Sequence, residues 1–241
     1  MKISIVGAGT DLGRLVVDRL EGLHELHLYS AGPLARADGH AAEGVEELDL
    51  REEDDAERCC RGVSAVVHLA PFARLSAAGD GAPAPGRREV ADADAVDYLD
   101  AIARGTYNLF DATREAGVDR VVLASSLALF DRYDPDYIVD EWWKPLPGTD
   151  PVTLGVYCAE EVARQYCLHG GIRCVALRFL PLGEDAERET HPDDAVAAVM
   201  RALELRFTVP GYRWRVFHVA TGARFGTTQA REILGWEAHH G

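Results

Sequence analysis

The feature that most constrains this chain is a glycine-rich turn near its beginning. A short β-branched run, residues 2–6, leads directly into Gly7-Ala8-Gly9-Thr10-Asp11-Leu12-Gly13, and apolar side chains then recur at helical spacing up to Leu20. Glycines at such a junction let the backbone turn tightly and approach a pyrophosphate, and the start of a helix offers free amides and a positive dipole end. The turn predicts a dinucleotide site, with a strand–helix turn that binds nothing as the alternative.

Details of this region bear on whether a dinucleotide binds and on which kind it is. The spacing is G-x-G-x-x-x-G, one residue longer than the usual G-x-G-x-x-G, and an inward-pointing Asp11 carboxylate would repel a pyrophosphate. Tyr29 and Ser30, at the end of the second expected strand, lack the acidic residue that binds a ribose 2′-hydroxyl. Ser30 with Arg36 would suit a 2′-phosphate, although a solvated loop arginine explains Arg36 equally well. Both NAD and NADP therefore remain candidates.

Strand-like and helix-like segments alternate along the whole chain. The expected strands are residues 2–6, 25–29, 45–48, 64–69, 120–125, 173–178 and 213–219, and the expected helices are 12–20, 96–116, 154–169, 191–205 and 227–234. Residues 76–86 predict a loop because they are rich in Ala, Gly and Pro, and residues 131–152 look irregular. This alternation predicts one α/β domain over residues 1–241, a Rossmann-type, doubly wound parallel sheet with helices on both faces.

Charge and cysteine content exclude several classes of function. The net charge is −15, which argues against nucleic acid and anionic membranes as partners. The five cysteines include no C-x-x-C pair or metal-ligand spacing, so we expect buried thiols, no metal ion and a reduced, cytoplasmic protein. His239 and His240 are interpreted as part of a tail and not as metal ligands. No apolar run has the length of a membrane span.

Several short motifs, in order along the chain, resemble the extended short-chain dehydrogenase/reductases of the NAD-dependent epimerase/dehydratase group. Residues 7–14 are similar to that family's G-A-x-G-x-[IL]-G-R turn, residues 49–51 to its D-L-x-D segment, and residues 66–70 to its V-x-H-L-A strand end. Residues 105–109, 120–126, 178–179, 193–194 and 234–236 resemble its G-T-x-N-L, V-x-x-S-S, L-R, V-D-D and L-G-W segments. The resemblance implies NAD or NADP, bound by Gly7, Gly9, Thr10, Leu12, Gly13, Ser30, Asp49, Leu50, Leu69 and Ala70.

The resemblance also implies an acid–base site, with one departure. The family uses a serine or threonine, a tyrosine and a lysine that lowers the tyrosine pKa. Ser126 matches the serine and Tyr157 the tyrosine, but Glu161 stands in place of the lysine. A carboxylate one helical turn away makes Tyr157 a poorer base. Arg164, two turns along the same helix face, would partly supply the missing charge; a plain Glu161–Arg164 surface pair is the alternative.

The chain is short for this family, which bears on its substrate and partners. The substrate-binding portion is reduced to about residues 181–241, which favours a small-molecule substrate, and the resemblance suggests a homodimer. Tyr133, Tyr137, Trp142 and Trp143 would line an apolar or aromatic pocket, with core packing or a dimer contact as the alternative for the two tryptophans.

Three functions remain open. The first is an atypical NAD(P)-dependent oxidoreductase or epimerase that keeps Ser126 and Tyr157 in register. The second is a non-redox lyase, isomerase or cyclase on the same fold, and the third is a sensor of a dinucleotide or metabolite. The missing lysine favours the second and third functions, and the retained Ser126 and Tyr157 favour the first.

Overall fold

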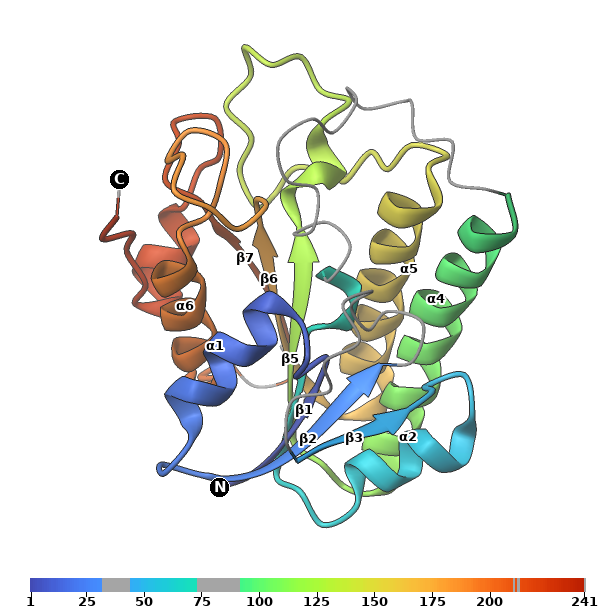
Figure 1. Ribbon diagram of the computed structural model, residues 1–241. Coiled ribbons are helices and arrows are strands. Elements are labelled where there is room, and N and C mark those ends of the chain that lie inside the picture. Colours follow the sequence, from blue (N-terminus) through green and yellow to red (C-terminus); the bar gives the residue numbers. More distant parts are fainter. Residues whose placement is uncertain (32–43, 73–91, 210, 212, 241) are drawn as a thin grey trace.

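The seven strands of the computed structural model form one parallel sheet in the order β3-β2-β1-β4-β5-β6-β7 (Figure 1). The structure describes residues 1–31, 44–72, 92–209, 211 and 213–240. The strands are β1 (Lys2–Val6), β2 (Glu25–Ala31), β3 (Val45–Leu48), β4 (Ala65–His68), β5 (Arg120–Ser126), β6 (Arg173–Phe179) and β7 (Trp214–Val219). The strand order reverses between β1 and β4, which is where open α/β sheets bind ligands, at the carboxyl ends of the strands.

Helices cover both faces of the sheet, which confirms the predicted doubly wound architecture. The α-helices are α1 (Asp11–Leu20), α2 (Glu53–Cys60), α4 (Asp92–Glu115), α5 (Pro151–Gln165) and α6 (Pro192–Glu204). Helices α1 and α6 lie on one face, and α2, α4 and α5 lie on the other (Figure 1). Short helical segments are η2 (Ala70–Phe72), η3 (Leu127–Phe130), η4 (Tyr166–Gly170) and η5 (Ala230–Leu234).

The apolar strands are buried on both sides because each face of the sheet has its own core. In β1, Ile3 and Ile5 pack on the α1 and α6 side, while Val6 packs on the side of α2, α4 and α5. Such alternation within a continuous apolar run is what a parallel sheet covered on both faces requires. The sheet is therefore a rigid platform whose carboxyl edge can hold a site.

Local sequence signals explain the start of α5 and the irregular segment before it. Asp150 caps α5 by accepting hydrogen bonds from the amides of Val152 and Thr153, and Pro151 occupies the first helical position. The helix therefore begins three residues earlier than expected. Residues 131–150 contain no helix or long strand, as predicted.

Predictions for the loop at residues 76–86, for Arg36 and for membrane spans remain to be compared with the structure. The expected loop at residues 76–86 and the position of Arg36 lie outside the described residues. Among the helices that the structure does describe, none is long and apolar enough to cross a membrane.

Candidate cofactor and active site

At two glycines of the turn, Gly7 and Gly13, backbone atoms of neighbouring residues approach so closely that a side chain would not fit. Gly7 has a φ of +93°, and a Cβ placed there would lie 3.0 Å from the amide nitrogen of Ala70. A Cβ on Gly13 would lie 2.1 Å from the Gly7 carbonyl oxygen. A Cβ on Gly9 would meet nothing within 4 Å. Gly7 and Gly13 thus shape the turn, and Gly9 presents bare backbone to open space, as an approaching pyrophosphate requires.

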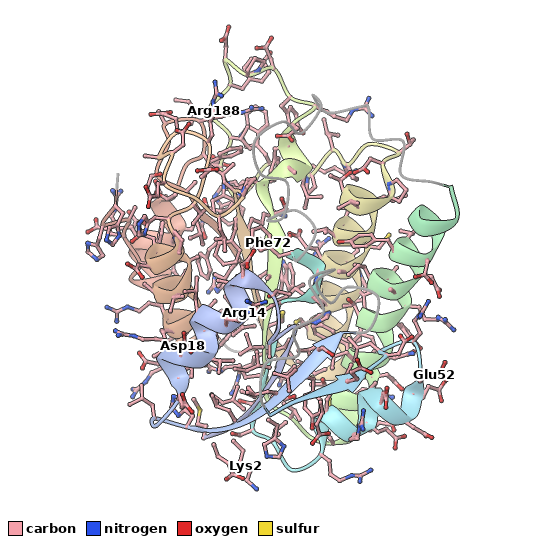
Figure 2. All side chains as sticks on the ribbon, viewed as in Figure 1. Lys2, Arg14, Asp18, Glu52, Phe72 and Arg188 are labelled. Atoms are coloured by element: carbon pink, nitrogen blue, oxygen red, sulfur yellow. The ribbon has the colours of Figure 1, made fainter. Side chains whose placement is uncertain are left out.

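Thr10 has a structural role inside this turn. Its hydroxyl donates to the Gly7 carbonyl at 2.7 Å and accepts from the Gly13 amide at 3.0 Å, so it caps α1. Arg14 donates from Nε and Nη2 to the Gly9 carbonyl, both at 3.2 Å. Figure 2 shows Arg14 and Phe72 well away from Lys2, which marks the opposite edge of the sheet. Thr10 takes the place of the middle glycine in the family's pattern without opening the turn, and the cradle fits a dinucleotide phosphate.

The segment after β3 is held by an aspartate–arginine pair. Asp49 accepts hydrogen bonds from Arg51 Nε at 2.9 Å and from Nη2 at 2.6 Å. These hydrogen bonds from Arg51 hold the pKa of the Asp49 carboxyl below its usual range, so it stays ionised. Asn108 on α4 donates to the carbonyls of Leu50 and Arg51 at 2.9 and 3.0 Å. Asn108 belongs to the motif at residues 105–109, so this motif positions residues 49–51. The family resemblance implies that these residues lie near the adenine of the cofactor.

The end of β4 completes the cofactor side of the edge. Leu69 and Ala70 are buried, and the Leu69 amide donates to the Val6 carbonyl at 2.8 Å. His68 is fully buried, with Nε2 3.1 Å from Thr106 Oγ1, and burial lowers its pKa to about 3. It is therefore neutral and helps join the sheet to α4. Ser30 lies at the end of β2, so the expected cofactor residues all lie at the carboxyl edge of β1 to β4.

The two expected acid–base residues lie at the next part of this edge. Ser126 ends β5, is 2% exposed and accepts the Ala128 amide at 3.0 Å, which caps η3. Tyr157 on α5 packs against the apolar cluster that contains Leu127 and Phe130. Among the described residues, no hydrogen bond joins Ser126 to Tyr157.

Burial and the neighbouring charges raise the pKa of the Tyr157 hydroxyl. Burial raises the pKa of Tyr157, Glu161 raises it further, and Arg164 opposes this with the smallest of the charge effects. The Arg164 guanidinium lies 3.7 Å from the Glu161 carboxylate, and both side chains are largely exposed. This geometry is that of a surface ion pair. Tyr157 is accordingly protonated at neutral pH, suited to donate a hydrogen bond or a proton.

Sequence reasoning missed a buried polar row beneath the same edge. Ser125, Arg178 and His218 lie opposite one another on β5, β6 and β7. Arg178 donates to the Glu160 carboxylate from Nε at 2.7 Å and from Nη2 at 2.6 Å, and the Ser125 hydroxyl donates to it at 2.5 Å. The Arg178 and Glu160 side chains are only 5% and 4% exposed. An arginine inside an apolar strand was the sequence signal, since a buried charge needs a partner.

The buried polar row also contacts the irregular segment, residues 131–150, and the short helix before it. The Arg178 guanidinium carbon lies 4.9 Å from the centre of the Phe130 ring, against which His218 packs edge-on at 5.3 Å. Burial, together with the Arg178 charge, lowers the pKa of His218 well below its usual value, so it is neutral. Glu141 accepts the His218 amide at 3.5 Å, and burial raises the pKa of its carboxyl. Residues 131–150 are thus tied to β7.

The aromatic residues of this segment divide into packed and exposed members. Trp143 packs edge-on against Tyr133 at 4.9 Å and lies 5.8 Å from Tyr137, measured between ring centres. Trp142 is 75% exposed. Trp143 therefore anchors the segment, whereas Trp142 projects from it.

The sheet order and the glycine turn at its switch point define a dinucleotide-binding α/β fold. The chain belongs to the NAD dependent epimerase/dehydratase family, whose profile matches residues 3–217. Membership confirms the resemblance, the NAD-type cofactor and the prediction of an enzyme of the oxidoreductase or epimerase kind.

Curated relatives are similar over much of the chain. L-arabinose 1-dehydrogenase (NAD(P)(+)) of Haloferax volcanii is 24% identical over 220 residues, which span 85% of this chain and 77% of that enzyme. Uronate dehydrogenase of Pseudomonas putida is 26% identical over 179 residues, 74% of this chain and 60% of that enzyme. The match with the uronate dehydrogenase thus leaves part of the enzyme's length without a counterpart.

Solved structures support the fold. Uronate dehydrogenase from Agrobacterium tumefaciens, complexed with NAD, superposes with a TM-score of 0.71 at 21% identity, over 98% of this chain and 83% of that one. UDP-glucose 4-epimerase from Thermotoga maritima gives a TM-score of 0.74 at 16% identity, over 99% and 94%. Both confirm the Rossmann-like arrangement.

Proposed function

We propose that this chain is an NAD(P)-dependent oxidoreductase that oxidises a hydroxyl group of a small, sugar-like metabolite. The observation that carries the proposal is the closed turn at Gly7 to Gly13, with open backbone at Gly9, next to the β5 edge that ends in Ser126. The names of the relatives, an L-arabinose dehydrogenase and a uronate dehydrogenase, support a carbohydrate substrate.

The turn would hold the cofactor pyrophosphate at the start of α1, with Leu12 and Gly13 in its first turn. Ser30, Asp49 and Leu50 would lie on the adenosine side, and Leu69 and Ala70 along the middle of the cofactor. When bound, the nicotinamide accepts or donates a hydride. The protein's own residues orient the reacting oxygen and handle its proton.

In this proposal the Ser126 hydroxyl donates a hydrogen bond to the substrate oxygen, and Tyr157 exchanges a proton with it. Because burial and the Glu161 carboxylate both raise the pKa of Tyr157, its hydroxyl is protonated at neutral pH, where it can donate a hydrogen bond to the substrate oxygen but rarely takes up a proton as a base. Arg164 weakly opposes this rise in the pKa of Tyr157, directly and by offsetting part of the Glu161 charge. The rate of hydroxyl oxidation should therefore increase as the pH rises and the Tyr157 phenolate forms.

One observation favours a second function, which is dinucleotide or metabolite binding without hydride transfer. Burial and Glu161 both work against a Tyr157 phenolate. A binding protein would not need this phenolate, and a non-redox lyase, isomerase or cyclase would use Tyr157 only as an acid.

Cofactor binding and turnover separate the two functions. We would titrate the purified chain with NAD⁺, NADH, NADP⁺ and NADPH, and then follow NAD(P)H absorbance with L-arabinose, glucuronate and their oxidised products. The first function predicts saturable binding and a turnover that falls about 10²- to 10⁴-fold in Tyr157→Phe. Glu161→Lys should raise the rate, and Arg164→Ala should lower it slightly.

Binding without turnover, unchanged in Tyr157→Phe, would establish the second function. Absence of binding at millimolar dinucleotide would overturn the first.

A further inference from the structure

The end of the described chain lies across the start of α6 (Figure 1). Trp236 Nε1 donates to the Asp194 carbonyl at 2.9 Å. The Asp194 carboxylate is buried and accepts the amide of His239 at 3.0 Å and that of His240 at 3.1 Å. Asp194 therefore fixes the backbone of residues 239 and 240, although the sequence favoured an unattached tail.

This docking brings two imidazoles and a carboxylate together. His191, Asp193 and His240 each offer a ligand atom, and these atoms all lie within 4.8 Å of one another. The rings of His191 and His240 stack with their centres 4.0 Å apart and their planes 12° apart. His240 Nε2 lies 4.0 Å from Asp193 Oδ2.

We propose that His191, Asp193 and His240 bind a divalent transition-metal ion, with Zn²⁺ as the representative ion. Two imidazoles and one carboxylate form a ligand set for Zn²⁺ and similar ions, whereas Mg²⁺ and Ca²⁺ prefer oxygen ligands alone. Three protein ligands leave a further position for water.

Asp194 supplies the supporting contact that metal-bound histidines commonly have. His240 Nδ1 lies 3.3 Å from Asp194 Oδ1, so the ring can donate its Nδ1 proton to this buried carboxylate. That hydrogen bond selects the tautomer with a free lone pair on Nε2, the nitrogen that faces Asp193. The carboxylates of Asp193 and Asp194 also offset the positive end of the α6 dipole, which would otherwise disfavour a cation.

Two adjustments accompany binding. The donor atoms must move closer by about 1 Å to reach a common ion at zinc bond lengths. The side chains of His240 and Asp193 are 46% and 73% exposed and are free to make this movement. His191 Nδ1 accepts the Asp193 amide at 3.2 Å, so coordination through this nitrogen would exchange a helix cap for a metal bond, whereas coordination through Nε2 would keep the cap.

The chain offers matched variants for a test. His240→Ala removes one ligand, and His191→Asn removes the imidazole but keeps a side chain that caps helices well. His239→Ala is the control because His239 is adjacent but lies outside the three-residue cluster. Each full-length variant would be titrated with ZnCl₂ and, separately, MgCl₂ by calorimetry near neutral pH, and its melting temperature would be recorded with and without metal.

We expect one Zn²⁺ per chain, a higher melting temperature with Zn²⁺, and no comparable response to Mg²⁺. His240→Ala and His191→Asn should each weaken Zn²⁺ binding by about tenfold or more, with His239→Ala close to the parent. The proposal is overturned by an absence of saturable Zn²⁺ binding, by equal Mg²⁺ binding, or by equal effects of His239→Ala and His240→Ala. Melting temperatures without metal identify any variant that fails to fold.

Discussion

The two halves of the sheet edge are built in different ways. At β1 to β4 the glycine turn depends on close backbone approaches at Gly7 and Gly13 that leave no room for a side chain, with the Thr10 hydroxyl as a cap. At β5 to β7 the structure depends on buried side chains, with Glu160 joined to Ser125 and Arg178. Adding a side chain at one of these glycines should destabilise the first half, whereas removing a buried charged side chain should destabilise the second.

The largest expected effect is on the second half. Arg178→Met removes the cation but leaves Glu160 buried and unpaired, so we expect the free energy of unfolding to fall by about 3–5 kcal/mol. Arg164→Met at the exposed pair with Glu161 is the control, with an expected change of about 0–1 kcal/mol. Urea unfolding of both variants measures the difference. Equal losses in the two variants would mean that burying the Arg178–Glu160 pair does not increase its contribution to the free energy of unfolding.

The first half responds to added atoms. Gly13→Ala places a Cβ against the Gly7 carbonyl, so we expect a loss of about 1–3 kcal/mol in unfolding free energy and weaker NAD binding. Gly9→Ala meets no protein atom within 4 Å, so it should keep stability and weaken NAD binding alone. Unfolding and NAD titration of the two variants distinguish the turn's shape from its binding surface. A Gly9→Ala variant that binds NAD normally would argue against a pyrophosphate at this position.

Each half also buries a neutral histidine, which predicts acid sensitivity. An unfolded histidine has a pKa near 6.5, whereas that of folded His68 is about 3. Above pH 6.5 both states are neutral, but below it only the unfolded chain takes up the proton. Stability therefore falls by about 1.4 kcal/mol per pH unit for this residue until pH nears 3. His218 adds to the loss in the same direction.

Unfolding measured between pH 7 and pH 5 tests this dependence. His68→Gln should reduce the slope of stability against pH, and the same substitution at exposed His169 is the control. An unchanged slope in His68→Gln would show that His68 takes up its proton in the folded state.

The smallest effect concerns the cap of α1. Thr10→Ala removes the hydroxyl that bonds to Gly7 and Gly13, and we expect a loss of about 1 kcal/mol in unfolding free energy. Thr10→Ser keeps the hydroxyl and should stay near the parent protein. If both variants lose the same amount, the methyl group of Thr10, and not its hydroxyl, stabilises the turn.

Most of the fold follows from local sequence patterns. Apolar β-branched runs predict the strands because a sheet covered on both faces demands them, and residues 45–48 were predicted with their observed bounds. Helix α2 was missed because its sequence is mostly charged and buries only Ala56, Cys59 and Cys60. A helix with so narrow an apolar stripe has a weak periodic signal.

The site is less predictable because only one part of it, the glycine turn, is defined by a local sequence pattern, whereas the other parts depend on contacts between distant residues. Glycines at a strand–helix junction reveal the turn, since no other residue satisfies the backbone at Gly7. The row that links Ser125, Glu160, Arg178 and His218 joins residues far apart in the sequence, and no local pattern pairs them. The contact of His240 with Asp194 likewise arises only when the chain folds back on α6.

The position of β1 inside the sheet has a consequence for synthesis of the chain. The Ser64 hydroxyl bonds to the carbonyl of Lys2, 62 residues away, and β1 pairs with β4 at the same place. A ribosome that adds about 5–20 residues per second releases β1 several seconds before β4 exists. During that interval Ile3, Ile5 and Val6 have no complete sheet to enter. Until β4 emerges, the apolar side chains of β1 therefore remain open to aggregation, and chaperones that bind apolar segments should act on them.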